Sequence, residues 1–253
     1  MTPAERTPHL PATRDNRDNR LGGGAMFDRI AQRYDRLNTI MSFGMHGRWR
    51  RALIRAIGPL EPGASVLDLA SGTADVAIAV AKRYPLTQVV GLDPSAGMLD
   101  VGQQKLDKAG LSHVVKLVVG DAQALPFRDN AFAATTISFG IRNVPDRARA
   151  LREMARVTRP GGKVAVLELS VPRGGLLSPF ARMHVRHIVP RLGAWLSGDR
   201  EYRYLQESIA AFPTPDAFAA MMGNASLRVD GTQRFAFGGA HLYVATAKPQ
   251  AEP

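Results

Sequence analysis

The middle of the chain, residues 64–169, alternates short runs of β-branched and other apolar residues with helical stretches of about three turns. Strands that are apolar throughout are buried on both faces, and intervening helices allow successive strands to run parallel. This alternation predicts an α/β fold with a parallel sheet between two layers of helices. The expected strands are 64–70, 87–93, 114–119, 132–139 and 162–169, and the expected helices between them are 73–84, 95–109 and 146–157.

The end of the chain departs from this alternation. Helical patterns near 200–211 and 215–224 are followed by two expected strands, 227–235 and 240–247, with only a short turn between them. Strands that close together pair as an antiparallel hairpin. We therefore expect a sheet of seven strands, mainly parallel, with the hairpin at its edge.

The remaining segments define the domain organisation. Residues 1–24 are rich in Pro, Arg, Asp and Asn and end in three glycines, which predicts a disordered tail. Residues 25–253 then form a single domain that begins with amphipathic cap helices over 25–60. Residues 172–199 fit no element of the sheet and form a basic, apolar insertion.

Composition excludes several kinds of chemistry. Cysteine is absent, so disulfides, thiolate nucleophiles and Cys-ligated metal centres are excluded. No apolar run approaches the roughly 18 residues of a membrane span, and the N-terminus lacks the apolar core of a secretory signal. We therefore expect a cytoplasmic protein. Its net charge of +11 is concentrated between residues 142 and 200, a stretch that contains 12 Arg and Lys but only four Asp and Glu. Such an excess of positive charge attracts nucleic acid, anionic membranes or acidic ligands.

Polar and small residues follow the expected strands at the edge where open α/β sheets bind ligands. The turn DLASGTAD (68–75) leads into a helix whose free N–H groups suit a negatively charged group. The turn contains a single glycine, Gly72, whereas the pyrophosphate-binding motif G-x-G-x-x-G requires three. Asp93 can accept hydrogen bonds from both ribose hydroxyls, Asp121 from an adenine amino group, and the N–H of Ala122 can reach a ring nitrogen. With Ser138 after the fourth strand, this nucleoside pocket fits S-adenosyl-L-methionine better than NAD or ATP.

The sequence also resembles a known family, the ubiquinone/menaquinone-biosynthesis C-methyltransferases, from Met26 to Lys248. The resemblance is carried by MFDRIAQRYDRLNTIMSFGMHGRWRR, VLDLASGTAD, GLDPSAGML, GDAQALPF, ISFGIRNV, EMARVTRPGG and YRYLQESI. It implies the Rossmann-like fold of class I S-adenosylmethionine-dependent methyltransferases and C-methylation of a prenylated quinol, a demethylmenaquinol or a ubiquinol precursor. The cofactor-binding residues it implies, with Gly72 of the turn, are Tyr34, Thr73, Asp93, Asp121, Ala122 and Ser138, with Tyr34 closing over the methionine end.

The turn departs from the family pattern GGTGD, because Ser71 and Ala74 replace two glycines. A positive φ at Ala74 would cost on the order of 1 kcal/mol. We expect Ala74 instead to lie in the first turn of the following helix, where alanine is favourable.

A quinol ring carbon becomes a good nucleophile when its hydroxyl is ionised, which a nearby positive charge favours. Arg142 does not deprotonate and is predicted to stabilise the phenolate, while Asn143 hydrogen-bonds a ring oxygen. The alternative is that Arg142 pairs with Asp146. Further candidates for contact with the substrate or its proton are Glu168, His184 and His187.

Residues 173–196 interleave apolar side chains with arginines and contain no acidic residue. They could lie on an anionic membrane surface, form a tunnel for a prenyl tail, or pack on the core as a lid. A nucleic-acid methyltransferase is disfavoured, since there is no cysteine nucleophile and the fourth strand ends in SFGI. A methyltransferase acting on another small phenolic or lipid substrate, or a non-catalytic binding module of the same fold, remains an alternative, and no metal is implied.

Overall fold

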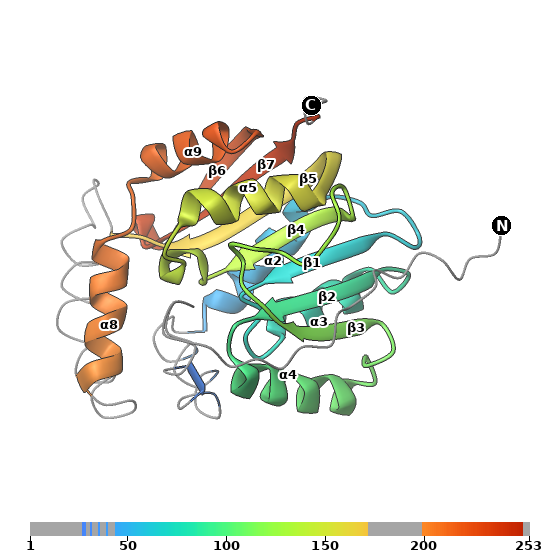
Figure 1. The fold of residues 1–253 in the computed structure, drawn as a ribbon. Helices are drawn as coiled ribbons and strands as arrows, with labels where there is room; N and C mark the ends of the chain where they lie inside the picture. Colours follow the sequence, from blue (N-terminus) through green and yellow to red (C-terminus); the bar gives the residue numbers. More distant parts are fainter. Residues whose placement is uncertain are drawn as a thin grey trace.

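The computed structural model describes residues 44–171 and 199–249, with the backbone alone at 199–203, and five earlier residues: Phe27, Asp28, Ala31, Asp35 and Thr39. A seven-stranded sheet in the order β3-β2-β1-β4-β5-β7-β6 runs through these residues (Figure 1). The strands are β1 (Ser65–Leu69), β2 (Gln88–Asp93), β3 (Val115–Val119), β4 (Phe132–Ser138), β5 (Thr158–Leu169), β6 (Leu227–Phe235) and β7 (Ala240–Ala247).

The pairing of the strands confirms the predicted sheet. β1 to β5 are parallel, and β7 runs antiparallel to both β5 and β6. The hairpin places β6 at one edge of the sheet, and β3 lies at the other. β5 begins earlier than predicted, at Thr158, which pairs with Phe132 before the register of the two strands shifts. The hairpin connection contains a short 3-10 helix, η4 (Ala236–Gly238).

Helices cover both faces of the sheet. Their bounds are α2 (His46–Ala56), α3 (Asp75–Arg83), α4 (Ala96–Ala109), η2 (Ile141–Asn143), α5 (Arg147–Val157), α8 (Asp199–Ala210) and α9 (Pro215–Asn224). α5 and α9 cover one face over a core that includes Phe132 and Met154. α2, α3 and α4 cover the other, with Leu53 and Val80 in its core. α8 stands beyond the carboxyl ends of the parallel strands (Figure 1).

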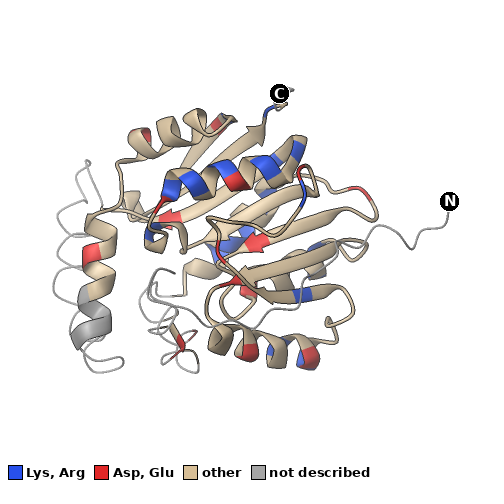
Figure 2. Ribbon diagram, viewed as in Figure 1, with Lys and Arg blue, Asp and Glu red and all other residues tan. Residues whose placement is uncertain are grey.

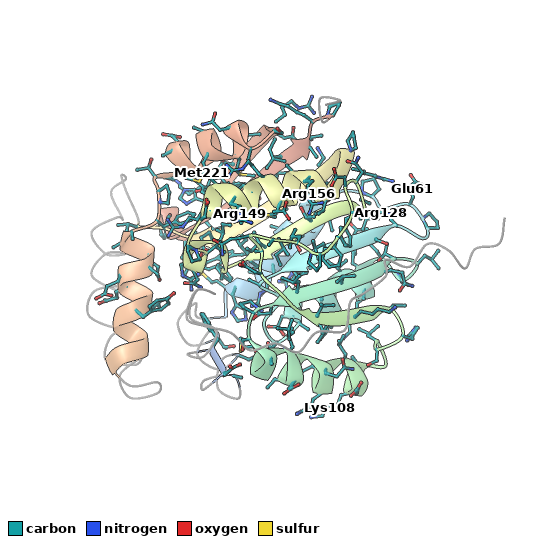
Figure 3. All side chains as sticks on the ribbon, viewed as in Figure 1. Glu61, Lys108, Arg128, Arg149, Arg156 and Met221 are labelled. Carbon is teal, nitrogen blue, oxygen red and sulfur yellow. The ribbon has the colours of Figure 1, made fainter. Side chains whose placement is uncertain are left out.

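Several basic residues lie along α5 (Figure 2). One of its residues, Arg156, also holds the loop between β3 and β4 (Figure 3). Its guanidinium donates to the carbonyl oxygens of Phe127 and Leu125, at 2.8 and 3.1 Å, and to the Asp129 carboxylate at 2.6 Å. Asp121 lies near the start of the same loop, so α5 helps to fix one wall of the candidate site.

The predicted cap helices, tail and insertion lie only partly within the described residues. α2 lies within residues 25–60, where the cap helices were predicted. The predicted tail, residues 1–24, lies outside the described residues, as do residues 172–198 of the predicted insertion. No helix within the described part of the chain is both long and apolar enough to span a bilayer.

The prediction that Ala74 lies in the first turn of a helix is wrong. Ala74 precedes α3 with φ +64° and ψ +21°, in the left-handed region. Ala70 and Gly72 also have positive φ, at +47° and +55°. This alternation turns the chain sharply after β1 and aims the N–H of Gly72 at the Asp93 carboxylate, 2.8 Å away. The demands of this turn outweigh the helical preference of alanine.

The strain at Ala74 can be measured against a neighbouring alanine. Ala74 and Ala77 are both fully buried, but Ala77 lies inside α3. We predict that Ala77→Gly lowers the free energy of unfolding by about 2 kcal/mol, from a lost methyl contact and poor helix propensity. Ala74→Gly should change it by less than about 0.5 kcal/mol, because relief of the positive φ offsets the lost methyl. Urea unfolding followed by circular dichroism measures both, and equal losses would contradict the assignment of strain.

Candidate active site

A cleft opens at the carboxyl edge of the sheet, around the point between β1 and β4 where the strand order reverses. It contains about 660 Å³ of empty space, part of it open to solvent. Switch points of this kind are where open α/β sheets bind ligands. Six of the nine residues predicted for the site line the cleft: Gly72, Asp93, Asp121, Ala122, Ser138 and Asn143.

The other three predicted residues lie elsewhere. Thr73 lines a smaller recess that shares Gly72 and Ser138 with the cleft. Its hydroxyl donates to the Asp35 carboxylate at 2.7 Å and accepts from the Lys105 ammonium at 3.1 Å. Arg142 is buried and does not line the cleft, as discussed below. Tyr34 lies outside the described residues.

Asp93 ends β2 with a buried carboxylate that joins two loops. One oxygen accepts from the N–H of Gly72 and the other from the N–H of Ser95, each at 2.8 Å. Burial raises the pKa of Asp93 to about 6, although the two N–H donors pull it the other way. Each oxygen keeps a second lone pair, so the carboxylate can still accept hydrogen bonds from a ligand.

Asp121 and Ala122 follow β3 on the far wall of the cleft. The Asp121 carboxylate accepts from the backbone N–H of Gln123 at 2.9 Å and from its side-chain amide at 3.0 and 3.1 Å. Gln123, which also lines the cleft, thus holds Asp121 in a fixed orientation. The sequence reasoning missed Gln123, although its position two residues after Asp121 is typical of an Asx turn.

Ser71 has a structural role in the turn after β1. Its hydroxyl donates to one oxygen of the buried Asp68 carboxylate at 2.8 Å, while the other oxygen accepts from Thr136 at 2.7 Å. Burial raises the pKa of Asp68 to about 6, and these hydroxyl donors counteract it. Ser71 therefore satisfies a buried polar group under the cleft.

The recess beside the cleft contains two buried polar atoms without hydrogen-bond partners among the described residues: Arg50 Nε and Ser138 Oγ. Arg50 lies on α2, and its Nη1 donates to the Asp75 carboxylate at 2.5 Å. Buried donors and hydroxyls are normally paired, so these two atoms retain hydrogen-bonding capacity. The motif HGRWRR offers three arginines, and only the packing of α2 distinguishes Arg50 from the others.

Arg142 pairs with Glu168, and the alternative pairing with Asp146 is wrong. Arg142 Nη1 donates to Glu168 Oε1 and to the carbonyl oxygen of Phe139, each at 2.6 Å. The backbone N–H of Arg142 donates to the other Glu168 oxygen at 3.1 Å. Asp146 instead caps α5 by accepting from the N–H of Arg149.

Glu168 is almost completely buried, with 1% of its side chain exposed. Its carboxylate also accepts from the N–H of Leu169 at 2.8 Å, so three donors hold it in place. Such a group compensates a buried charge and fixes the turn η2, with Asn143 on the cleft side. His184 and His187, the other candidates named with Glu168, lie outside the described residues.

Comparison with known proteins matches this chain to one family of methyltransferases. The model of the ubiE/COQ5 methyltransferase family matches residues 14–247. The ubiquinone/menaquinone biosynthesis C-methyltransferase UbiE of Syntrophotalea carbinolica is 42% identical over 84% of this chain and 90% of its own length. The demethylmenaquinone methyltransferase of Thermus thermophilus is 42% identical, covering 87% of this chain and 98% of its own.

A solved structure extends the comparison to the fold. Haemonchus contortus phosphoethanolamine N-methyltransferase 2, in complex with S-adenosyl-L-methionine, matches with a TM-score of 0.61 over 88% of this chain and 60% of that one. The two sequences are 16% identical, so the likeness concerns the fold alone. The predicted fold class is confirmed by the sheet and these comparisons together.

Removing the charge of Glu168 tests the buried ion pair. We predict that Glu168→Gln lowers the free energy of unfolding by about 3 kcal/mol, because Arg142 stays buried without its counter-charge. The matched control is Glu153→Gln, which removes a carboxylate paired with Arg156 at the more exposed surface of α5 and should cost about 1 kcal/mol or less. Urea unfolding of both variants gives the comparison. Equal losses would show that the Arg142–Glu168 pair adds nothing beyond a surface contact.

Proposed function

Because the chain belongs to the ubiE/COQ5 methyltransferase family, we propose that it transfers a methyl group from S-adenosyl-L-methionine to a ring carbon of a prenylated quinol. The two relatives described above are named for ubiquinone/menaquinone biosynthesis and for demethylmenaquinone, which supports a quinol of either kind. A methyltransferase of the same fold acting on another small phenolic or lipid substrate is the second candidate. The observation that carries the proposal is Asp93, whose carboxylate lines the cleft beside the switch point of the sheet.

The residues of the cleft fit the methyl donor part by part. Asp93 would accept hydrogen bonds from the ribose hydroxyls. Asp121 and the N–H of Ala122 would hold the adenine edge. The unpartnered Arg50 Nε and Ser138 Oγ of the recess suit the polar amino-acid end. When bound, S-adenosyl-L-methionine supplies an electrophilic methyl group.

The substrate side of the cleft carries Asn143, and we propose that this residue contacts the quinol. Its amide would donate to a ring oxygen, which favours the ionised hydroxyl that activates the ring carbon. We propose that Arg142 supports Asn143 in this role. The adjacent carboxylate of Glu168 balances most of the positive charge of Arg142. Its contribution is therefore to hold η2, so that Asn143 and the bound methyl donor keep a reactive alignment.

The reaction can be tested with the purified protein, methyl-labelled S-adenosyl-L-methionine and a reduced prenylated naphthoquinol in lipid vesicles. We expect label in the product, and we expect that product to reoxidise to a quinone. A C-methyl quinol can reoxidise, whereas an O-methyl ether cannot. A reduced prenylated benzoquinol in a parallel reaction distinguishes the two quinol classes. A third reaction offers a water-soluble phenol, and label in that product alone would favour the second candidate.

The same assay addresses location. We propose that the arginine-rich residues 173–196 hold the protein at an anionic membrane surface where the prenyl tail resides. Turnover should then be faster with substrate in anionic vesicles than in neutral ones. Equal rates, together with no sedimentation of protein with anionic vesicles, would refute this part of the proposal.

The raised pKa of Asp93 predicts how cofactor affinity depends on pH. Ribose hydroxyls bind the ionised carboxylate, so binding requires a group whose pKa is about 6 in the free protein. Between pH 5 and 7 the affinity for S-adenosylhomocysteine should rise about tenfold as this carboxylate ionises. Isothermal titration calorimetry of the wild type and Asp93→Asn tests this. The variant should bind more weakly and without this pH dependence, and a flat wild-type profile would contradict the role of Asp93.

A further inference from the structure

Tyr204, on α8, reaches the turn that carries the proposed substrate contact. Its hydroxyl donates to Asn143 Oδ1 at 3.3 Å, across 61 residues of sequence. The ring is half-buried. Asn143 lines the cleft, so this hydrogen bond links a helix beyond the carboxyl ends of the strands to the active-site wall.

The amide of Asn143 presents different chemistry on its two sides. Its oxygen accepts hydrogen bonds, whereas its nitrogen carries two N–H donors. The backbone under it is already fixed, because the N–H of Asn143 donates to the Gly140 carbonyl at 3.0 Å and the Arg142–Glu168 pair holds the preceding residue. The side-chain amide of Asn143 can still rotate, and the Tyr204 hydroxyl restricts this rotation by donating a hydrogen bond to the amide oxygen.

We propose that Tyr204 is a positioning residue that occupies the amide oxygen of Asn143 and thereby leaves the amide N–H donors for the substrate. The inference rests on the proposed function, because the substrate atom concerned is the ring oxygen of the quinol. A site that presents N–H donors favours an ionised or carbonyl oxygen and disfavours a hydroxyl that must donate. The residue would thus help to select the reactive form of the substrate.

The surroundings of Tyr204 keep it a donor. Burial raises the pKa of its phenol, and the nearby positive charges of Arg142 and Arg147 only partly offset this effect. The hydroxyl therefore stays protonated at neutral pH and can donate to Asn143 throughout the reaction. Arg147 also fixes the turn from α5, since its Nη2 donates to the carbonyl oxygen of Arg142 at 2.8 Å.

The test is a double-mutant cycle between Tyr204→Phe and Asn143→Ala, assayed with the prenylated quinol. Tyr204→Phe should lower kcat/KM for the quinol about tenfold, as expected for one lost hydrogen bond that orients a charge-stabilising donor. Its affinity for S-adenosylhomocysteine should be unchanged. In the Asn143→Ala background, the same substitution should have no further effect, because the group that it orients is gone. Tyr84→Phe is the matched control: its hydroxyl donates to the Gly58 carbonyl at 2.7 Å, and its loss should not alter kcat/KM.

An equal effect of Tyr204→Phe in both backgrounds would overturn the inference and assign Tyr204 to general packing of α8. So would an unchanged kcat/KM in the single variant. A parallel loss of S-adenosylhomocysteine affinity would overturn it too.

If the wild type does not methylate the quinol, the proposed function fails, and the side-chain amide signals of Asn143 in a 15N NMR spectrum decide separately on the positioning role. These signals are assigned by their absence in Asn143→Asp. They should shift in Tyr204→Phe and not in Tyr84→Phe, and unshifted signals would refute the orientation by Tyr204.

Discussion

The buried carboxylate of Asp93 is the interaction on which the site depends. It ties the turn after β1 to the start of α4 by accepting from the N–H groups of Gly72 and Ser95. Burying this charge is unfavourable, which explains its raised pKa, and only fixed donors make it tolerable. The left-handed conformations of Ala70 and Ala74 are the local consequence, because they shape the turn that delivers one of those donors. The strained turn and the buried Asp93 carboxylate thus depend on each other, and the cleft lies beside both.

The hydrogen bonding of the buried polar groups near the cleft agrees with the roles that we propose for them. Glu168 and Asp68 are buried, and every oxygen of their carboxylates accepts at least one hydrogen bond from the chain itself. Ser138 Oγ and Arg50 Nε lack a partner among the described residues, and both line the recess next to the cleft. The first pair sets the shape of the site, whereas the second leaves hydrogen-bonding capacity for a bound molecule. Asn143 lies between these roles, held by the chain on one side and facing the cleft on the other.

The fold could be predicted because its determinants are local and periodic: apolar runs defined the strands to within a few residues, and strand ends located most of the cleft. The errors came from contacts that no local pattern encodes. Ala74 has high helix propensity, but the geometry of the turn decides its conformation. Arg142 was predicted to stabilise a substrate phenolate, with pairing to nearby Asp146 as the alternative, yet its partner is Glu168, 26 residues away. Tyr204 escaped notice because its contact with the turn is visible only once α8 is placed.

A crystal structure of the protein with S-adenosylhomocysteine would test the central claim most directly. The account predicts both ribose hydroxyls within hydrogen-bond distance of the Asp93 carboxylate and the adenine beside Asp121 and Ala122, with the amino-acid end in the recess at Arg50 and Ser138. A ligand bound elsewhere, or a ribose that makes no contact with Asp93, would contradict it.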